Sequence, residues 1–219
     1  MQVGMIGGTG PAGRALAVRL ASVGVDVLVG SRSAERAGQI VDELIEKWPD
    51  RQLTIAGAEN ERAAEAELVI VATPWDSAPA MTATLAPLLA DKVVVSMANA
   101  LVKVGPELQA LVPARGSVTA EVQAAAPGAM VAAAFQHLPS KHLADLAYPI
   151  ESDVLVCSDH PQATKAVCDL IGRVPGLRPV DAGSLAQAAA VEAFTAVLAT
   201  VNIRYRVRSA VRLTGIDSA

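Results

Sequence analysis

The sequence predicts an α/β protein with a doubly wound, mostly parallel sheet, and two observations lead to this fold class. Short apolar runs typical of buried strands alternate with stretches in which apolar residues recur at helical spacing. A glycine-rich turn joins the first strand to the first helix. The 219 residues suit one domain over 1–150 and a smaller C-terminal part, with a helical element, over 151–219.

The turn after the first strand, which we place at residues 2–6, has the pattern Gly8-x-Gly10-x-x-Gly13. We expect Gly8 to permit a tight turn, Gly10 to let a pyrophosphate approach the backbone, and Gly13 to let the helix pack on the strand. The helical pattern that follows ends at Gly24, and its free N–H groups would face the phosphates. The pattern predicts a Rossmann-type dinucleotide site; an ordinary glycine-rich turn is the alternative.

The end of the second strand, at 25–29, indicates which dinucleotide would bind. An NAD site usually has a carboxylate there for the ribose 2′-hydroxyl, whereas this chain has Ser31 and Arg32, with Arg36 one helical turn further on. A hydroxyl and guanidinium groups suit a 2′-phosphate, so NADP(H) is favoured over NAD(H). The alternative is that Ser31 caps the next helix and Arg32 is solvated.

The remaining elements continue the alternation. A helix with one apolar face is expected over 37–48, where Pro49 ends it. The uninterrupted apolar runs at 68–72 and 92–96 are typical of strands buried on both faces. Further strands are expected at 53–56, 131–134, 154–157 and 177–180, and further helices at 60–65, 76–89, 161–171 and from 184 to 200.

Unusual polar and aromatic residues follow three of these strands, where ligands bind in open α/β sheets. Trp75 either covers the cofactor or packs at a helix start. Asn99 either binds a ligand amide or is a turn residue that tolerates a left-handed backbone. His137 is expected to be a hydrogen-bonding loop residue rather than a catalytic one, because no Cys or carboxylate lies at triad or ligand spacing from it.

The helical region at 184–200 is apolar nearly all round and is broken by Glu192. It is predicted to be too short and too polar to span a membrane. A helix that is apolar on all faces must be covered, so we expect a homodimer that packs these helices together.

Three arginines beyond this helix, Arg204, Arg208 and Arg212, are four residues apart. On a continuing helix they would form one cationic stripe, which suits an anionic ligand. Arginines on a solvated face or in dimer salt bridges are the more usual explanation of such spacing.

Composition excludes several classes of function. The net charge of −4, without a basic cluster interleaved with aromatics, speaks against nucleic-acid binding. Cys157 and Cys168 have no His or Cys neighbours at metal-ligand spacing, so we expect reduced thiols and no metal site. The chain begins directly with a strand pattern and not with a signal peptide. We therefore expect a soluble, cytoplasmic protein.

Four motifs together carry a resemblance to a known family: Gly7-Gly8-Thr9-Gly10, Ser31-Arg32, Thr73-Pro74-Trp75, and the tail from Asn202 through Arg204-Tyr205 to Arg212-Leu213-Thr214-Gly215. From residue 2 to about residue 216, the chain resembles the NADPH-dependent reductases of coenzyme F420, an 8-hydroxy-5-deazaflavin. The resemblance implies reversible hydride transfer between nicotinamide C4 of NADP(H) and C5 of the deazaflavin, in a cytoplasmic homodimer.

The resemblance also implies roles for individual residues. The residues that would hold the NADP phosphates are Thr9, Pro11, Ala12, Ser31, Arg32 and Arg36, and those along the nicotinamide ribose are Thr73, Pro74, Met97 and Ala98, with Trp75 beside them. The deazaflavin would lie toward Asn99, Gln136, His137, Leu138 and the C-terminal helix with Asn202 and Arg204. Two departures concern the deazaflavin edge: Gln136 stands where the family often has His or Asn, and Ile203 where it often has Arg.

Hydride transfer between two bound rings needs proximity and alignment and no protonating side chain, so no catalytic acid–base residue is expected. Two other functions remain open. An NADPH-dependent reductase of an imine or small carbonyl would need a proton donor, for which His137 or Tyr205 is the candidate. A non-catalytic NADPH-sensing module would bind the nucleotide without turnover.

Overall fold

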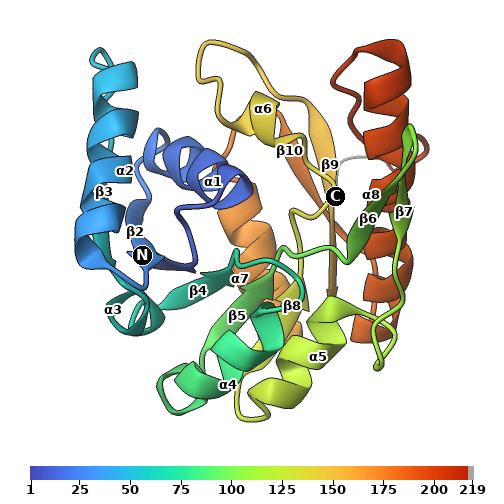
Figure 1. The fold of residues 1–219 in the computed structure, drawn as a ribbon, viewed down its shortest axis with the longest axis horizontal. Helices are drawn as coiled ribbons and strands as arrows, with labels where there is room; N and C mark the ends of the chain where they lie inside the picture. Colours follow the sequence, from blue (N-terminus) through green and yellow to red (C-terminus); the bar gives the residue numbers. More distant parts are fainter. Residues whose placement is uncertain (217–219) are drawn as a thin grey trace.

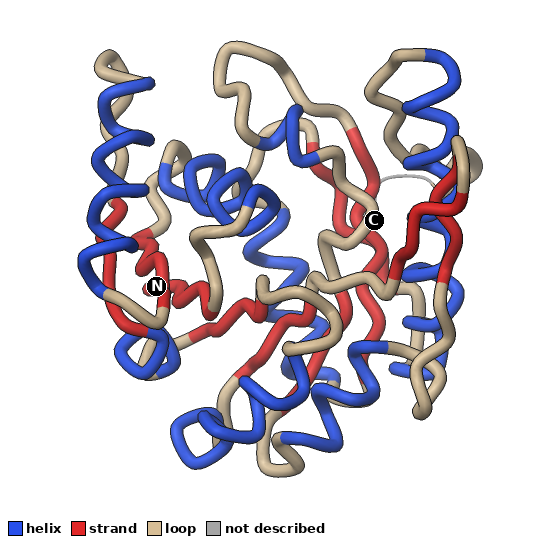
Figure 2. The backbone as a smooth tube through the Cα atoms, in the orientation of Figure 1, coloured by secondary structure: helices blue, strands red, loops and turns tan. Residues whose placement is uncertain are grey.

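The computed structural model describes residues 1–216, in which an eight-stranded sheet lies between layers of helices (Figure 1, Figure 2). The strand order is β10-β9-β8-β5-β4-β1-β2-β3. Neighbouring strands are parallel except β8 and β9, which pair antiparallel. This confirms the predicted fold class, and the order reverses between β1 and β4, where doubly wound sheets bind ligands.

The bounds of the elements are as follows. The sheet contains β1 Gln2–Ile6, β2 Asp26–Ser31, β3 Ile55–Glu59, β4 Leu68–Val71, β5 Val93–Ser96, β8 Met130–Ala133, β9 Ser152–Ser158 and β10 Leu177–Asp181, and a separate hairpin contains β6 Leu101–Val104 and β7 Glu107–Ala110. The helices are α1 Pro11–Ala21, α2 Ala34–Lys47, α3 Asn60–Ala64, α4 Ala78–Leu89, α5 Val118–Ala125, α6 Ser140–Leu143, α7 Pro161–Ile171 and α8 Ala188–Tyr205, preceded by a 3₁₀ turn at Leu185–Gln187.

The core lies on both faces of the sheet, as the uninterrupted apolar runs predict. All four residues of β4 and all four of β5 are buried. Helices α1 and α7 cover one face, and α4 and α5 cover the other. Aliphatic side chains and alanines supply most of both layers, because the chain has only six aromatic residues. The central strands are therefore held rigidly, and their carboxyl ends present the site.

In the turn between β1 and α1, the glycine whose conformation permits the turn is not the one predicted. The left-handed residue is Gly7, with φ of +68°, and not Gly8. Gly8 is required for a different reason: a Cβ there would lie 2.9 Å from the Cβ of Met5. A Cβ on Gly13 would lie 2.9 Å from Gly8 Cα, so this glycine lets the helix pack closely on the turn, and not on the strand as had been predicted.

The start of α2 shows that the alternative interpretation, in which Ser31 caps this helix, is wrong. The helix cap is Ser33, whose Oγ accepts a hydrogen bond of 3.2 Å from the Arg36 N–H. Ser31 ends β2 and accepts a weaker bond of 3.4 Å from the Ser33 N–H. The Ser31 hydroxyl group therefore keeps its proton available for another acceptor.

The C-terminal part joins the same sheet through β9 and β10. The sheet therefore does not separate the two predicted parts, 1–150 and 151–219. That the first binds the nucleotide and the second completes the pocket stays a prediction. Three features were not predicted: the β6–β7 hairpin, α5 and the short helix α6. Glu192 of α8 accepts hydrogen bonds from the N–H groups of Val118 and Thr119 at the start of α5, at 2.8 and 3.0 Å, so α8 is fixed to α5.

Helix α8 ends at Tyr205, because Arg206 adopts a left-handed conformation with φ of +55°. The cationic stripe that a continuing helix would form is therefore absent. Its arginines instead pair separately: Arg204 with Glu107 at 2.7 Å, Arg208 with Asp145 at 3.9 Å, and Arg212 with Asp153 at 3.6 Å.

The prediction that the apolar helix at 184–200 is too short to span a membrane is wrong, because the helix is longer than predicted. Leu185–Tyr205 has 21 residues and a mean hydropathy of 1.4, which passes the length and composition criteria for a span. Such a match is weak, since core helices of globular proteins pass it too. Here Glu192 and Thr200 bond to α5 and β7, as in a helix that packs within its own domain.

Candidate functional site

A cleft of about 750 Å³ opens at the carboxyl ends of β1, β2, β4 and β5. All the predicted cofactor residues line it except Gly8 and Gly13, which lie beneath the turn: the lining includes Thr9, Gly10, Pro11, Ala12, Ser31, Arg32, Arg36, Thr73, Pro74, Trp75, Met97 and Ala98. Asn99 lines the cleft as well. Folding therefore brings together four separate segments that were singled out from the sequence: the glycine turn, 31–36, 73–75 and 97–99.

The glycine turn and the start of α1 form the phosphate-binding end of this cleft. A Cβ built on Gly10 would meet nothing closer than 3.8 Å, so the space beside it is open to a ligand. Asn60, which is 3% exposed, fixes the turn: its Oδ1 accepts a bond of 3.0 Å from the Gly7 N–H. The sequence analysis missed Asn60 as a site residue, although it begins a predicted helix beside the turn.

The corner at the end of β2 is suited to an anion. Arg32 and Arg36 are exposed, and neither guanidinium forms an ion pair or hydrogen bond with any residue in 1–216. No Asp or Glu lines the cleft within the described part of the chain. Two free guanidinium groups and the Ser31 hydroxyl thus face the cleft without a competing carboxylate.

The opposite corner contains buried polar atoms that no described residue satisfies. Thr73 Oγ1 and Asn99 Oδ1 have no hydrogen-bond partner. Because the Asn99 amide group donates to the Gln136 carbonyl at 2.9 Å, its free atom is the acceptor oxygen. Unpartnered buried polar atoms are costly unless a ligand or water satisfies them. An acceptor here fits the N–H groups of a nicotinamide carboxamide.

Gln136, His137 and Leu138 are buried behind Asn99 and do not line the cleft. The Gln136 amide group donates to the Ser96 carbonyl at 3.1 Å, and His137 Nε2 donates to the Asp153 carbonyl at 2.9 Å. Burial lowers the pKa of His137, so its ring is neutral near pH 7. The predicted hydrogen bond of His137 is thus present, and the absence of a catalytic role stays a prediction.

The structure does not place Asn202 and Arg204 at the cleft. Asn202 Oδ1 accepts bonds from the N–H and hydroxyl of Ser209, at 2.6 and 2.8 Å. Arg204 binds Glu107 of β7 and lines a different groove, between β7 and α8. The cause is the course of α8, which runs along β7 before the chain turns back at Arg206.

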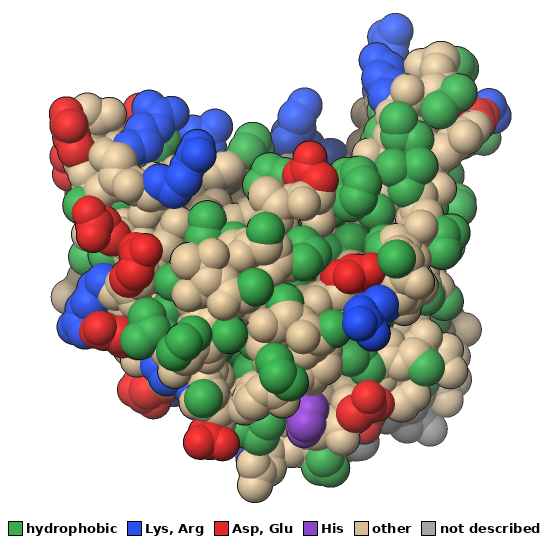
Figure 3. Space-filling model, turned by 60° about the horizontal axis from the view of Figure 1, so that its bottom comes forward, with side chains coloured by type: hydrophobic (Ala, Val, Ile, Leu, Met, Phe, Trp, Pro, Cys, Tyr) green, Lys and Arg blue, Asp and Glu red, His purple; other side chains and the backbone are tan. Residues whose placement is uncertain are grey.

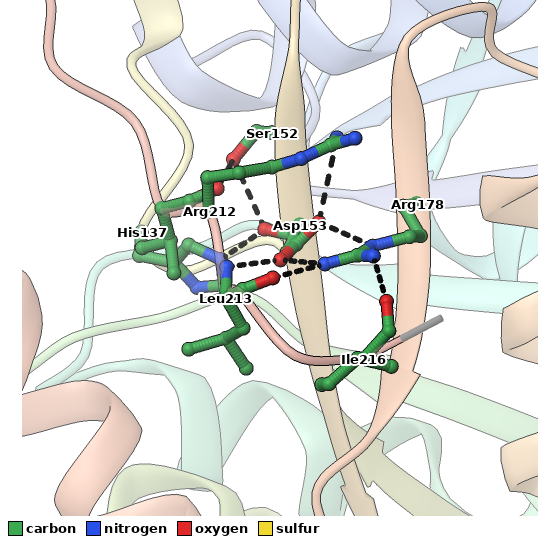
Figure 4. A network of polar contacts seen from close by, with 8 residues as sticks. His137, Ser152, Asp153, Arg178, Arg212, Leu213 and Ile216 are labelled. Atoms are coloured by element: carbon green, nitrogen blue, oxygen red, sulfur yellow. Dashed lines mark hydrogen bonds and ion pairs between the residues drawn. The ribbon is translucent and has the colours of Figure 1, made fainter. Parts of the chain in front are cut away.

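The tail motif has a structural role, which Figure 4 shows around Asp153. The fully buried Asp153 carboxylate binds Arg178 through two bonds of 2.8 and 2.7 Å and accepts a bond of 2.6 Å from the Leu213 N–H. Arg212 lies 3.6 Å from the same carboxylate. Hydrogen bonds from Arg178 hold the pKa of Asp153 below its ordinary value. The tail is therefore anchored to β9 and β10.

The fold and the cleft define a Rossmann-type, nucleotide-dependent oxidoreductase. Residues 2–100 match the family described as NADP oxidoreductase, coenzyme F420-dependent. The F420-dependent NADP reductase of Methanocaldococcus jannaschii is 33% identical over 99% of this chain and 100% of its own length. That of Methanothermobacter thermautotrophicus is 31% identical over 99% and 96%. The chain belongs to the family of F420-dependent NADP reductases.

Solved structures agree with this fold. A protein from Arthrobacter sp. FB24 superposes with a TM-score of 0.77 at 25% identity, covering 94% of this chain and 95% of that one. The pyrroline carboxylate reductase of Plasmodium falciparum, solved with NADP bound, gives a TM-score of 0.55 at 15% identity over 83% of this chain and 58% of that one. The second likeness concerns the fold alone.

Proposed function

We propose that this protein catalyses reversible hydride transfer between NADP(H) and the deazaflavin coenzyme F420. Family membership over the whole chain supports this function. The observation that carries it in the structure is the cleft with two unpaired arginines at the end of β2, because it suits the phosphorylated nucleotide that this reaction requires.

The chain's own residues bind and align the reactants. Backbone N–H groups at the start of α1 receive the pyrophosphate, and Arg32 and Arg36 with Ser31 bind the 2′-phosphate. The Asn99 Oδ1, which has no partner among the described residues, would accept a hydrogen bond from the nicotinamide carboxamide. Met97 and Ala98, which are nearly buried, close the floor of the cleft and exclude water.

When bound, NADP(H) supplies nicotinamide C4 and the deazaflavin supplies C5 as the two carbons that exchange the hydride. The protein's contribution is then proximity and orientation rather than proton transfer. His137 fits this account, since its Nε2 is occupied by the Asp153 carbonyl and its ring is neutral. The loop of Asn99, which lines the cleft, would border the second ring.

A spectroscopic assay tests the proposal. Purified protein, NADPH and oxidised coenzyme F420 are mixed, and the absorbance of the oxidised deazaflavin is followed. We expect bleaching that depends on enzyme concentration and reverses when NADP⁺ is added to the reduced coenzyme. Binding of NADPH without any bleaching would contradict the proposal and would favour a nucleotide-sensing module.

A homodimer through α8 is part of the proposal. Phe194, Val197 and Ile203 of this helix are 41%, 55% and 50% exposed. Apolar side chains gather on the right-hand side of the molecule in Figure 3, where α8 and the hairpin lie in Figure 1. A second copy would cover this surface, and light scattering of the purified protein measures the resulting mass.

We also place the protein in the cytoplasm, in line with two free cysteines. Burial raises the pKa of the Cys157 thiol to about 11, so it stays protonated and unreactive at neutral pH. Such thiols fit a reducing compartment, and fractionation of cells that express the protein tests the location.

A further inference from the structure

The short helix α3 lies directly against β1 and β2, beside the glycine turn. Two glycines outside the pattern of that turn make this approach possible. A Cβ on Gly4 of β1 would collide with the Ala63 carbonyl oxygen, and a Cβ on Gly30 of β2 would lie 2.9 Å from Asn60 Oδ1. A larger residue at either position would therefore push α3 away from the sheet.

The close approach of α3 brings its first residue, Asn60, to the turn. The buried Asn60 accepts a hydrogen bond of 3.0 Å at Oδ1 from the Gly7 N–H, 53 residues away in the sequence. On the other side, its Nδ2 lies 3.9 Å from Met81 Sδ of α4. A backbone N–H needs an acceptor and a thioether sulfur is a weak acceptor, so both neighbours require the same orientation of the amide group.

Gly7 connects this contact to the phosphate-binding end of the cleft. It has the left-handed φ of +68°, and its carbonyl oxygen accepts a long bond of 3.4 Å from the Gly10 N–H. Gly10 is the N-cap residue of α1 and, being glycine, brings no side chain to the first N–H groups of that helix. Those N–H groups are the donors available to a pyrophosphate. A shift of Gly7 would therefore displace these donors.

The other end of α3 is held by a separate contact. Lys92, just before β5, donates from Nζ to the Ala64 carbonyl oxygen at 2.8 Å. Neither of these two residues lines the nucleotide cleft. Helix α3 thus has one hydrogen bond that reaches the glycine turn and one that does not, which allows the two to be tested against each other.

We propose that Asn60 is a positioning residue for the nucleotide pyrophosphate, which acts by holding Gly7 in its left-handed conformation. This inference rests on the proposed function, in which the start of α1 receives the pyrophosphate. Asn60 then affects every ligand that carries a pyrophosphate, with or without a 2′-phosphate. Arg32, by contrast, affects only ligands that carry the 2′-phosphate. The cleft therefore has two separable parts, one that binds any dinucleotide and one that selects NADP(H).

The test compares three ligands by calorimetric titration: NADPH, NADH and adenosine 2′-monophosphate, which has the phosphate for Arg32 but no pyrophosphate. Asn60→Leu keeps the approximate volume and removes the acceptor for the Gly7 N–H. We expect it to raise the Kd of NADPH and NADH at least about fivefold and to leave that of adenosine 2′-monophosphate within about twofold. Arg32→Ala should weaken NADPH and adenosine 2′-monophosphate and leave NADH nearly unchanged.

Steady-state kinetics adds a second measurement. In Asn60→Leu, the KM for NADPH should rise by a similar factor while kcat changes by less than about twofold, because the change affects binding and not the reacting rings. The matched control is Lys92→Met, which removes one hydrogen bond from the other end of the same helix. It should leave all three Kd values within about twofold. If Asn60→Leu does not fold, Asn60→Ala removes the same acceptor without adding bulk and should give the same pattern.

Three results would overturn the inference: unchanged Kd values for NADPH and NADH in a folded Asn60 variant, an equal loss for adenosine 2′-monophosphate, or the same loss in Lys92→Met. The second would mean that the whole cleft is disturbed, and the third that any loosening of α3 is sufficient. If the wild type bleaches the coenzyme but the Asn60 variants bind NADPH normally, the inference fails and the proposed function stands. If the wild type binds NADPH without bleaching, the proposed function fails while the role of Asn60 is still measured.

Discussion

Two pairs of arginines in this protein have opposite surroundings. Arg178 and Arg212 lie against the buried Asp153 carboxylate, which also accepts the Leu213 N–H. Arg32 and Arg36 face the cleft and pair with no described residue. The first pair fixes the tail to the sheet, whereas the second is available to a ligand. The chemistry of the side chains is the same, so the presence of an internal partner distinguishes scaffold from site.

For uncharged groups, position relative to the cleft separates the residues. Gln136 and His137 bond to backbone carbonyls through the amide group and Nε2, and their unpartnered atoms, Oε1 and Nδ1, are buried away from the cleft. The unpartnered Thr73 Oγ1 and Asn99 Oδ1 belong to residues that line the cleft. A buried polar group that is left unsatisfied costs stability, so its retention fits a bound partner. The comparison predicts that changes at the anchor affect folding, and changes at the cleft affect binding.

The largest expected effect is on folding. Asp153→Asn keeps the shape of the side chain but removes the charge that Arg178 and Arg212 share. We expect the free energy of unfolding to fall by about 3 kcal/mol, because one partner of a buried ionic network is lost. Urea denaturation followed by circular dichroism measures it.

A matched control is Asp169→Asn, which breaks an exposed pair with Lys165 and should leave the unfolding free energy nearly unchanged. An equally small change for Asp153→Asn would mean that the anchor does not hold the tail, and the comparison would fail.

The next effect is on binding. Arg32→Ala should raise the KM for NADPH at least about tenfold and affect NADH little, because only the 2′-phosphate forms the charge-assisted contact. The melting temperature should not change, since Arg32 has no partner among residues 1–216. Steady-state kinetics with both nucleotides measures the difference. Equal effects on NADPH and NADH would refute the 2′-phosphate role.

A smaller effect concerns pH and a second buried carboxylate, Glu192. Burial raises its pKa above the ordinary 4.5 despite the bonds from Val118 and Thr119. Its contribution is thus complete below pH 4.5 and is lost as pH rises through the folded pKa. The lowered pKa of Asp153 has the opposite sign: its contribution is present above pH 3.8 and is lost as pH falls through the folded pKa.

Unfolding free energies between pH 2 and pH 8 check these signs. Relative to the wild type, Glu192→Gln should remove a component that declines above about pH 4.5, and Asp153→Asn one that declines below about pH 3.8. The same pH dependence in both variants would contradict the distinction between a carboxylate held by arginines and one held by backbone N–H groups.

The smallest expected effect is on catalysis. His137→Phe should change the rate of hydride transfer to coenzyme F420 by less than about threefold, because no proton is transferred by a side chain. It should lower the free energy of unfolding by about 1 kcal/mol through loss of the bond to the Asp153 carbonyl. A loss of more than about a hundredfold in rate would support a donor role in an imine or carbonyl reductase.

Much of the fold could be predicted because its signals are local. The buried runs of β4 and β5, the periodicity of α2 and the glycine turn before α1 each reflect the geometry of a few neighbouring residues. The β6–β7 hairpin was missed, although Val102 and Val104 alternate with Lys103 before Gly105, whose φ is +57°. That alternation is too short to stand out from a loop.

The stripe of three arginines is absent for a different reason. A spacing of four residues predicts that Arg204, Arg208 and Arg212 would align on a continuing helix. It does not predict where the helix ends. The chain turns at Arg206 and returns so that Leu213 reaches Asp153, 60 residues away in the sequence. The long-range anchor therefore overrides the local pattern.

The sequence by itself determined the alternation of strands and helices, the glycine turn and the absence of a carboxylate after β2, since backbone geometry and burial depend on nearby residues. Only the tertiary structure decided which arginines are neutralised and which polar atoms stay free. Pairing of charges depends on which distant residues folding brings within bonding distance: Asp153 finds Arg178 and Leu213, whereas Arg32 and Arg36 find none among the residues described.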